Sequence, residues 1–545
     1  MSRPTSRRRF LATTAGATAG AAAIMLPGTA GAAVSAPVRQ GRLAAQPDAP
    51  GVSWPPGQVL PRFATPTQLD VANMTGVAAD EQLLLTTLQG VVNRSSPRIY
   101  MLQPQNEGLY TWLDDLPVRY DVASNPLSLL TKYRGEITGA VLYDPAVPGT
   151  VNVATTLAGL HDAVATSAAL ATSSGLPVVA DLRGMFTSDL DAYTWAVANL
   201  WSHTTHRMLI GLDPGISGYL RDYAVANRSL VVFLDPGVPA ELALLQQVLG
   251  DIPVGSPYLG WWPSSVSGES DGTQVTSQYG LFVVASDWSA NLTVLGGVQA
   301  PINGSQYHAP VPPLANKVYV TFTMTEGDNL QYNQHRLRQI WDDPSRGQVP
   351  LNWSVQPLGA EAAPTFLSYY QRTATRNDYL MAGPSGAGYA YPSDWPAAKL
   401  GVYTGLVRRY LDRTGMDAAV ILNRYGGQDI AMDGATAQRY VSDVRPLGLL
   451  EAWTDYTQTS VIGGSAPLSV SWLASSVAEA TQAIATASAG WDGSAPLFLS
   501  IGTLAWNLMP ADVVTIASSL TSDYVVVRGD QYFALARQAL GLPPR

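Results

Sequence analysis

Short apolar runs alternate with amphipathic stretches from residue 65 to residue 250. The amphipathic stretches, beginning with one over 80–92, have the spacing of helices, and the apolar runs have the length of buried strands. This alternation is typical of an α/β region with a mostly parallel sheet. The expected strands are 98–102, 140–143, 177–180, 208–212 and 230–234.

The pattern changes after residue 250. Residues 258–262 and 281–285 have the pattern of strands joined by turns rich in Gly and Ser, and a Pro-rich break follows at 309–313. The sequence therefore predicts an N-terminal α/β region. Its boundaries are 63–308, with subdomains 63–250 and 251–308 as one interpretation, and a linker over 309–316 follows it.

Regular repeats of a strand and a helix fill 317–545. Eight such units predict a C-terminal (β/α)8 barrel of the TIM type, which would hold the catalytic site. Strands five and six are joined without a clear helix, so a distorted or seven-stranded barrel is the alternative. The expected strands are 317–324, 351–355, 378–382, 418–423, 449–453, 468–472, 497–501 and 524–528.

The first residues have the pattern of an export signal. Arg7 and Arg8 lie in the segment Ser-Arg-Arg-Arg-Phe-Leu, an apolar run follows, and residues 30–32 supply small side chains for a peptidase. These features predict a twin-arginine signal peptide over 1–32 and a flexible leader over 33–62. A membrane helix is the alternative reading, but the apolar run is short and weakly hydrophobic for a span. We expect export through the Tat machinery and a secreted protein without a membrane span.

Composition excludes several kinds of site and partner. The chain has no cysteine, which excludes disulfides, thiolate metal sites and cysteine nucleophiles. Removing the four signal arginines from the 32 basic residues leaves 28 against 41 acidic residues, a net charge near −13 that disfavours nucleic acid as a partner. The 14 Trp and 25 Tyr suit sugar ligands, although such residues also fill the cores of large proteins.

Acidic residues follow several expected barrel strands, and the active site of such a barrel lies at the carboxyl ends of its strands. Glu326 and Asp328 follow the first strand, and Asp455 follows the fifth. A pair of carboxylates at this rim could protonate a leaving oxygen and attack, or activate water. Asp328 could instead cap a helix, Asp455 could be a turn residue, and Asp530 is better explained as opening the last helix.

Amides, aromatic residues and an arginine accompany these acids at the same expected rim. Trp and Tyr rings provide stacking platforms for sugars, while Asn, Gln and Arg side chains hydrogen-bond to hydroxyl groups. The candidate substrate-binding residues are Asn329, Gln331, Gln356, Tyr389, Tyr391, Asp394, Asn423, Arg424, Trp453 and Trp506.

No metal or cofactor site is expected. Of the five histidines, only His203 and His206 are close in sequence, and no paired acid accompanies them. No phosphate-binding loop and no nucleophile elbow stands at a strand–helix junction. A zinc-dependent deacetylase is therefore disfavoured.

The segment Gly386-Ala-Gly-Tyr-Ala-Tyr-Pro392 matches the signature Gly-x-Gly-Tyr-x-Tyr-Pro letter for letter. The chain thereby resembles the GxGYxYP family, and residues 87–94, 260–262 and 325–331 are also similar to segments of that family. The resemblance implies a barrel hydrolase acting on glycans. Thr325-Glu326 stands where the family has Ser-Asp, so Asp328 heads the catalytic candidates.

The resulting hypothesis is a secreted glycoside hydrolase acting on extracellular oligo- or polysaccharide. A non-catalytic glycan-binding or cell-surface protein on the same fold is the first alternative, because fold does not dictate activity. A lyase or deacetylase is the second. Retention and inversion differ in carboxyl separation, about 5 Å against about 6.5–9.5 Å, and the sequence leaves this choice open.

Overall fold

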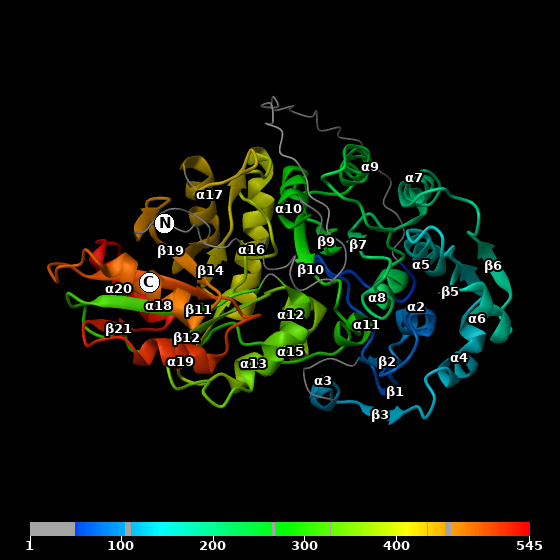
Figure 1. The fold of residues 1–545 in the computed structure, drawn as a ribbon, viewed down its shortest axis with the longest axis horizontal. Coiled ribbons are helices and arrows are strands. Elements are labelled where there is room, and N and C mark those ends of the chain that lie inside the picture. Colours follow the sequence, from blue (N-terminus) through cyan, green and yellow to red (C-terminus); the bar gives the residue numbers. More distant parts are fainter. Residues whose placement is uncertain (1–48, 104–110, 264–267, 328, 433, 453–458) are drawn as a thin grey trace.

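The computed structural model describes residues 49–103, 111–263, 268–327, 329–432, 434–452 and 459–545. In these ranges the chain forms an N-terminal half with three small parallel sheets and a C-terminal half built around one closed barrel (Figure 1). The expected α/β class with a TIM-like barrel is therefore confirmed. None of the helices in these ranges is long and apolar enough to cross a bilayer.

The first two sheets have three strands each, and both are parallel. Their orders are β2-β1-β3 and β5-β4-β6. The strands are β1 (Gln68–Asn73), β2 (Ile99–Leu102), β3 (Arg119–Val122), β4 (Ala140–Leu142), β5 (Val164–Thr166) and β6 (Val178–Asp181). The helices are α2 (Ala79–Ser95), α3 (Thr111–Asp115), α4 (Ser128–Lys132), η1 (Arg134–Glu136), α5 (Thr150–His161), α6 (Ala168–Ser173), α7 (Asp189–Asn199) and η2 (Trp201–His203).

The third sheet is parallel and has the order β10-β9-β7-β8. Its strands lie on both sides of residue 250, so the change of sequence pattern there falls inside one sheet. The strands are β7 (Leu209–Gly211), β8 (Val231–Val232), β9 (Pro257–Gly260) and β10 (Phe282–Ala285). The helices are α8 (Arg221–Ala226), α9 (Pro239–Leu249), α10 (Gly268–Gln278) and α11 (Leu292–Leu295).

Seven parallel strands close the C-terminal barrel, and β11 pairs with both β20 and β12. The eighth expected strand, β21, pairs only with the first half of β11, so it lies beside the ring rather than completing it. The ring strands are β11 (Val318–Met324), β12 (Leu351–Val355), β13 (Asp378–Ala382), β14 (Ala418–Ile421), β17 (Gly448–Ala452), β19 (Ala466–Ala474) and β20 (Leu497–Thr503), and β21 is Tyr524–Val526.

Strands five and six of the barrel, β17 and β19, are joined without a helix among the described residues, as the sequence pattern indicated. A short strand, β18 (Ser460–Ile462), pairs antiparallel with β19 instead. Two further short strands, β15 (Arg424–Tyr425) and β16 (Gln428–Asp429), form a hairpin after β14.

Helices cover the outside of the barrel. The helical segment after β11 is divided at His335, whose backbone leaves the helical region. The helices are α12 (Leu330–Gln334), α13 (Arg336–Trp341), α14 (Gly359–Ala362), α15 (Pro364–Thr373), η3 (Ala397–Lys399), α16 (Leu400–Thr414), α17 (Gly434–Val444), α18 (Val477–Ser488), α19 (Pro510–Ser518) and α20 (Gly529–Ala539).

The last helix, α20, closes the amino-terminal end of the barrel. The Gly529 N–H donates to Oδ1 of Asn352 near the start of β12 (2.7 Å), and the Tyr532 hydroxyl donates to Oγ of Ser469 in β19 (2.9 Å). Phe533 packs on Gly448, where a Cβ would approach the ring to 2.0 Å. The site must therefore lie at the opposite, carboxyl-terminal end.

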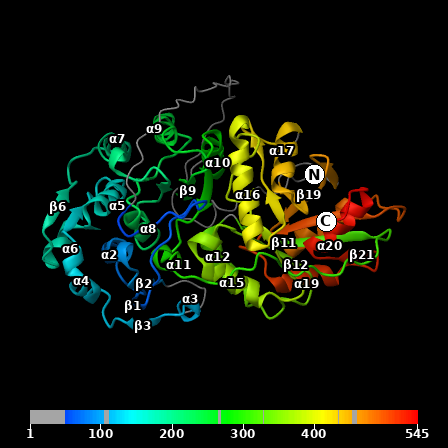
Figure 2. The same ribbon diagram turned by 180° about the vertical axis from the view of Figure 1, so that it is seen from behind.

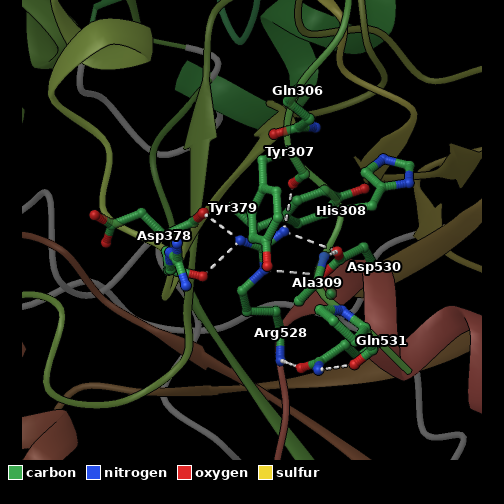
Figure 3. A network of polar contacts seen from close by, with 12 residues as sticks. Gln306, Tyr307, His308, Ala309, Asp378, Tyr379, Arg528, Asp530 and Gln531 are labelled. Atoms are coloured by element: carbon green, nitrogen blue, oxygen red, sulfur yellow. Dashed lines mark hydrogen bonds and ion pairs between the residues drawn. The ribbon is translucent and has the colours of Figure 1, made fainter. Parts of the chain in front are cut away.

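A buried ion pair anchors this helix (Figure 3). Arg528 and Asp530 are 1% and 3% exposed, and their charged atoms lie 2.7 Å apart. Arg528 also donates to the Tyr307 carbonyl oxygen (2.6 Å), while Asp530 accepts from the Ala309 N–H (2.6 Å). The pair thus joins the linker between the two halves to the closed end of the barrel, which is a structural role.

Removal of the Asp530 charge is expected to destabilise the protein. Asp530→Asn leaves the Arg528 cation buried without its carboxylate, and breaking such a pair typically reduces the free energy of unfolding by about 3–5 kcal/mol. Denaturant unfolding of the variant measures this loss. The control, Asp412→Asn, breaks the exposed pair with Arg408 and should have little effect. Equal effects of the two variants would contradict the structural role of the buried pair.

Candidate functional site

Strand β10 of the third sheet docks directly on the barrel rim. The Val283 N–H donates to the Tyr389 carbonyl oxygen (2.8 Å), and the Tyr389 N–H donates back to the Val283 carbonyl oxygen (2.7 Å). Ala285 forms a second β-bridge, in parallel orientation, with Asn329, a residue that follows β11 in the sequence. Both views of the fold show α10 and α16 side by side where the two halves meet (Figures 1 and 2). The carboxyl end of β10 is thereby held against the carboxyl rim of the barrel.

The Gly-x-Gly-Tyr-x-Tyr-Pro loop makes this docking sterically possible. A Cβ at Gly388 would lie 2.4 Å from the Phe282 ring, so only glycine permits the close approach of the loop to β10. Gly386 has φ +103°, a conformation that side chains rarely adopt, and its Cβ position faces Val407. The glycines of the signature therefore allow the backbones of the two halves to come into contact.

The signature tyrosines lie inside the junction rather than at an open surface. Tyr389 is 0% and Tyr391 1% exposed, and their hydroxyl oxygens are 3.3 Å apart. The Tyr389 hydroxyl donates to Glu269 of α10 (2.8 Å), and the Tyr391 N–H donates to Oγ of Ser277 (2.9 Å). Burial, followed by the nearby Glu269 carboxylate, raises the pKa of Tyr391. The expected sugar-stacking role does not fit this position, because both rings pack against protein.

Glu326 occupies a tight turn at the end of β11. Its φ is +78°, which is uncommon for a residue with a side chain, and it is 3% exposed. A Cβ at Gly327 would lie 2.3 Å from the Ser354 backbone, so the turn is pressed onto β12. Strained residues of this kind concentrate at functional sites, and Glu326 is the described carboxylate of the expected catalytic segment 325–331.

Three predicted ligand-binding amides hold the rim together instead. Asn329 caps α12 by accepting from the Tyr332 N–H (2.9 Å). Gln356 is 1% exposed, and its Oε1 accepts from the Leu358 N–H (3.2 Å). Asn423 binds the backbone and side chain of Ser393. Because protein groups already occupy these amides, their observed role is to shape the loops.

Gln331 connects the barrel to the carboxyl end of β10. Its Oε1 accepts from the Trp288 N–H (2.6 Å), and His335 donates from Nε2 to the Trp288 carbonyl oxygen (2.8 Å). Asp287, the preceding residue, is 9% exposed. Burial raises the pKa of Asp287 to about 6, against a smaller opposite effect of the Gln331 side chain. A carboxyl group with such a pKa suits proton transfer near neutral pH.

Two exposed tryptophans flank α12 at this mouth. Trp506, which follows β20, is 36% exposed and meets the Tyr332 ring at 5.7 Å. Trp288, which follows β10, is 44% exposed and meets the Tyr219 ring at 5.0 Å. Exposed rings held by neighbouring aromatic residues are suitable sugar platforms. Trp506 thus stays a candidate sugar platform, and Trp288 is a further candidate.

A second cluster of polar side chains lies between α10 and the barrel loops. Arg424 is 6% exposed and donates to the Gly427 carbonyl oxygen (2.6 Å), with Asp271 at 3.8 Å. Asp394 is half-buried, and burial raises its pKa to about 6. This cluster mixes one cation with several carboxyl groups, so it offers polar contacts to a ligand without a clear charge preference.

Three predicted site residues, Asp328, Trp453 and Asp455, lie outside the described residues. Within the described ranges, no group of three or more His, Asp or Glu side chains is arranged to hold a metal ion. The candidate residues that the sequence interpretation did not include are Asp287, Trp288 and Glu269. Asp287 and Trp288 could have been found, because they follow an expected strand as the barrel candidates do.

Protein-family models match almost the whole of the described part of the chain. The model described as "GxGYxYP putative glycoside hydrolase C-terminal domain" matches residues 316–537. Three further GxGYxYP models, for the first, second and third N-terminal domains, match 68–135, 137–204 and 206–297. These three ranges contain the strands of the three small sheets.

One solved structure has the same fold over most of both chains. It is titled as a putative hydrolase from Bacteroides thetaiotaomicron, and it is 21% identical with a TM-score of 0.78, covering 90% of this chain and 99% of its own. At this identity the likeness establishes the fold alone. A Staphylococcus aureus MnaA–UDP structure, 9% identical, covers 71% of this chain and 79% of its own, but its TM-score is only 0.13. No curated protein matches the chain.

A methyl group at Gly388 is expected to disturb the docking of β10. In Gly388→Ala the new Cβ would meet the Phe282 ring, and overpacking of this kind typically costs about 1–3 kcal/mol. Thermal unfolding should show a lower midpoint, and limited proteolysis should cleave the junction faster. The control, Gly405→Ala on the outer face of α16, has open space for its Cβ and should be neutral or stabilising. A Gly388→Ala protein as stable as this control would contradict the packing argument.

Proposed function

The chain belongs to the GxGYxYP family, and from this premise we propose that it is a glycoside hydrolase with its site at the carboxyl rim of the barrel, where the third sheet meets it. The substrate class is oligo- or polysaccharide. The observation that carries the proposal is the close placement of the Glu326 turn, the Asp287 carboxyl group and two exposed tryptophans around α12.

Each of these groups has a role in glycosidic bond cleavage. Hydrolysis needs one group that protonates the leaving oxygen and another that attacks the anomeric carbon or activates water. Glu326 is our described candidate for the second role, and Asp328 and Asp455 remain candidates from the sequence. Trp506 and Trp288 would stack on sugar rings beside the scissile bond.

Loss of the Glu326 carboxylate should abolish most of the activity. A panel of 4-nitrophenyl glycosides and oligosaccharides, with products followed by mass, identifies a substrate of the wild type. On that substrate, Glu326→Gln should reduce kcat by about a hundredfold or more while the fold is kept, because amides neither attack nor accept a proton. The control, Glu479→Gln, changes an exposed residue in the first turn of α18 and should retain activity.

The panel also separates hydrolysis from its alternatives. A wild type that binds oligosaccharides but cleaves none would point to a glycan-binding protein. Products with an unsaturated sugar would identify a lyase, and release of acetate alone would identify a deacetylase. Each of these results would overturn the proposed hydrolysis.

We further propose that the chain is exported in the folded state by the twin-arginine route. Residues 1–48 lie outside the described residues, so the support is the sequence motif and the absence of cysteine. The proposal places the substrate outside the cell.

Replacement of the paired arginines should block this export. In a bacterial host with a twin-arginine system, Arg7→Lys combined with Arg8→Lys should leave the protein in the cytoplasm, because the translocase recognises the arginine pair. Arg9→Lys, a matched change outside the pair, should still allow export. Cell fractionation followed by immunoblotting measures the distribution. Equal export of the two variants would rule out this route.

A further inference from the structure

We infer that Asp287 of the third sheet is the proton donor to the leaving oxygen in the proposed hydrolysis, so that the active site is shared between the third sheet and the barrel. The inference rests on the proposed function. It adds a catalytic residue from outside the barrel and names the chemistry of that residue.

The topology of the third sheet places Asp287 at a binding crevice. In the order β10-β9-β7-β8, the chain moves from β7 to β8 on one side and then returns to β9 on the other. Ligands in open α/β sheets bind outside the carboxyl ends of the strands at such a reversal. Asp213 follows β7 and Trp261 follows β9, the strands that flank the reversal, and Asp287 follows the adjacent strand β10.

The Asp287 carboxyl group is buried without full hydrogen bonding. The residue is 9% exposed, and its Oδ1 has no hydrogen-bond partner among the described residues. An unpartnered polar atom in a buried position is unfavourable unless a ligand or a proton compensates it. Burial therefore keeps this carboxyl group protonated at a higher pH than usual, with a pKa of about 6.

The groups that face Asp287 come from several elements. Asp213, after β7, raises the pKa of Asp287, and the Gln331 side chain lowers it. Burial, followed by the nearby Asp287 carboxyl group, raises the pKa of Tyr258 of β9. His335 binds the backbone of the next residue, Trp288. Among the described groups that shift the pKa of Asp287 most, none is an arginine or lysine side chain.

Helix α12 joins Asp287 to the barrel acid. Gln331 contacts the Asp287–Trp288 segment. The next residue is Tyr332, and burial, followed by the nearby Glu326 carboxylate, raises the pKa of its hydroxyl. Two acids with different surroundings thus border one short helix. Two carboxyl groups held in different environments are the pattern of acid–base catalysis, because the environment of each group sets its role.

The proposed step conserves atoms and charge. The Asp287 carboxyl proton passes to the glycosidic oxygen as the bond from that oxygen to the anomeric carbon breaks, and Asp287 becomes a carboxylate. Water supplies the hydroxyl group of the second product and a proton that restores Asp287. No oxidant, reductant or cofactor enters this step.

A matched control exists in the same half of the molecule. Asp222 is also buried, its pKa is also raised to about 6 because of burial, and its Oδ1 also has no hydrogen-bond partner among the described residues. Its Oδ2 accepts from the Thr293 hydroxyl (2.7 Å) where α8 packs on α11, away from the barrel rim. Asp222→Asn therefore reports the structural effect of neutralising a buried carboxyl group. Asp287→Asn adds the loss of a proton donor.

The test compares two leaving groups on one sugar. A 2,4-dinitrophenolate leaves without protonation, whereas the sugar alcohol released from an oligosaccharide must be protonated as it leaves. The 4-nitrophenolate leaving group lies between these two in its need for a proton. For the sugar cleaved in the panel, Asp287→Asn should reduce kcat/KM by about 10²–10⁴-fold on the oligosaccharide but less than about tenfold on the dinitrophenyl glycoside. Asp222→Asn should change both alike, and Asp287→Glu should keep more oligosaccharide cleavage than Asp287→Asn.

A second readout does not depend on activity. The unfolded Asp287 carboxyl group ionises near pH 4 and the folded one near pH 6, so the wild type loses stability as pH rises through this window. The asparagine variant lacks this loss. The melting temperature of Asp287→Asn relative to the wild type should therefore rise between pH 4 and pH 7.

The outcomes separate the inference from the function on which it rests. A wild type that cleaves no glycoside overturns both. A wild type that cleaves oligosaccharides, with Asp287→Asn unaffected or equally impaired on both leaving groups, overturns the role of Asp287 alone. The role of Asp287 is also overturned if the melting-temperature difference between Asp287→Asn and the wild type stays the same from pH 4 to pH 7. A proton donor must be a neutral acid in the folded protein, and such an acid makes this difference depend on pH.

Discussion

The pairing of β10 with the signature loop is the contact on which the candidate site depends. Two reciprocal hydrogen bonds join Val283 to Tyr389, and a further bridge joins Ala285 to Asn329. Backbone pairing fixes both distance and register, because each strand residue has one partner. The carboxyl end of the third sheet is therefore fixed against the barrel rim, and residues from both halves can act on one ligand.

The two ends of the barrel differ in the groups that they hold. At the amino-terminal end, α20 and the buried Arg528–Asp530 pair close the barrel and join it to the linker. At the carboxyl-terminal end, Glu326 lies in a strained turn and two tryptophans remain exposed. This division follows the general behaviour of such barrels, in which the loops after the strands carry function.

The sequence predicted the elements better than their arrangement. Each barrel strand was expected near its observed place, since a buried parallel strand is a nearly continuous apolar run. Helix α10 was missed because its residues, rich in Gly, Ser and Thr, are weak helix formers that depend on packing. The tyrosines of the signature were expected at an open rim, yet the structure buries them against α10.

Local pattern alone determined the α/β class, the barrel and the family signature, because periodicity and short motifs depend on neighbours in sequence. It also proposed Glu326 and Trp506 as candidates, because they follow barrel strands. Only the tertiary structure decided which polar residues are already bound by protein and which remain for a ligand. It also brought Asp287 to the barrel rim, since that residue lies about 40 positions before Glu326 and follows the strand β10 that pairs with the rim.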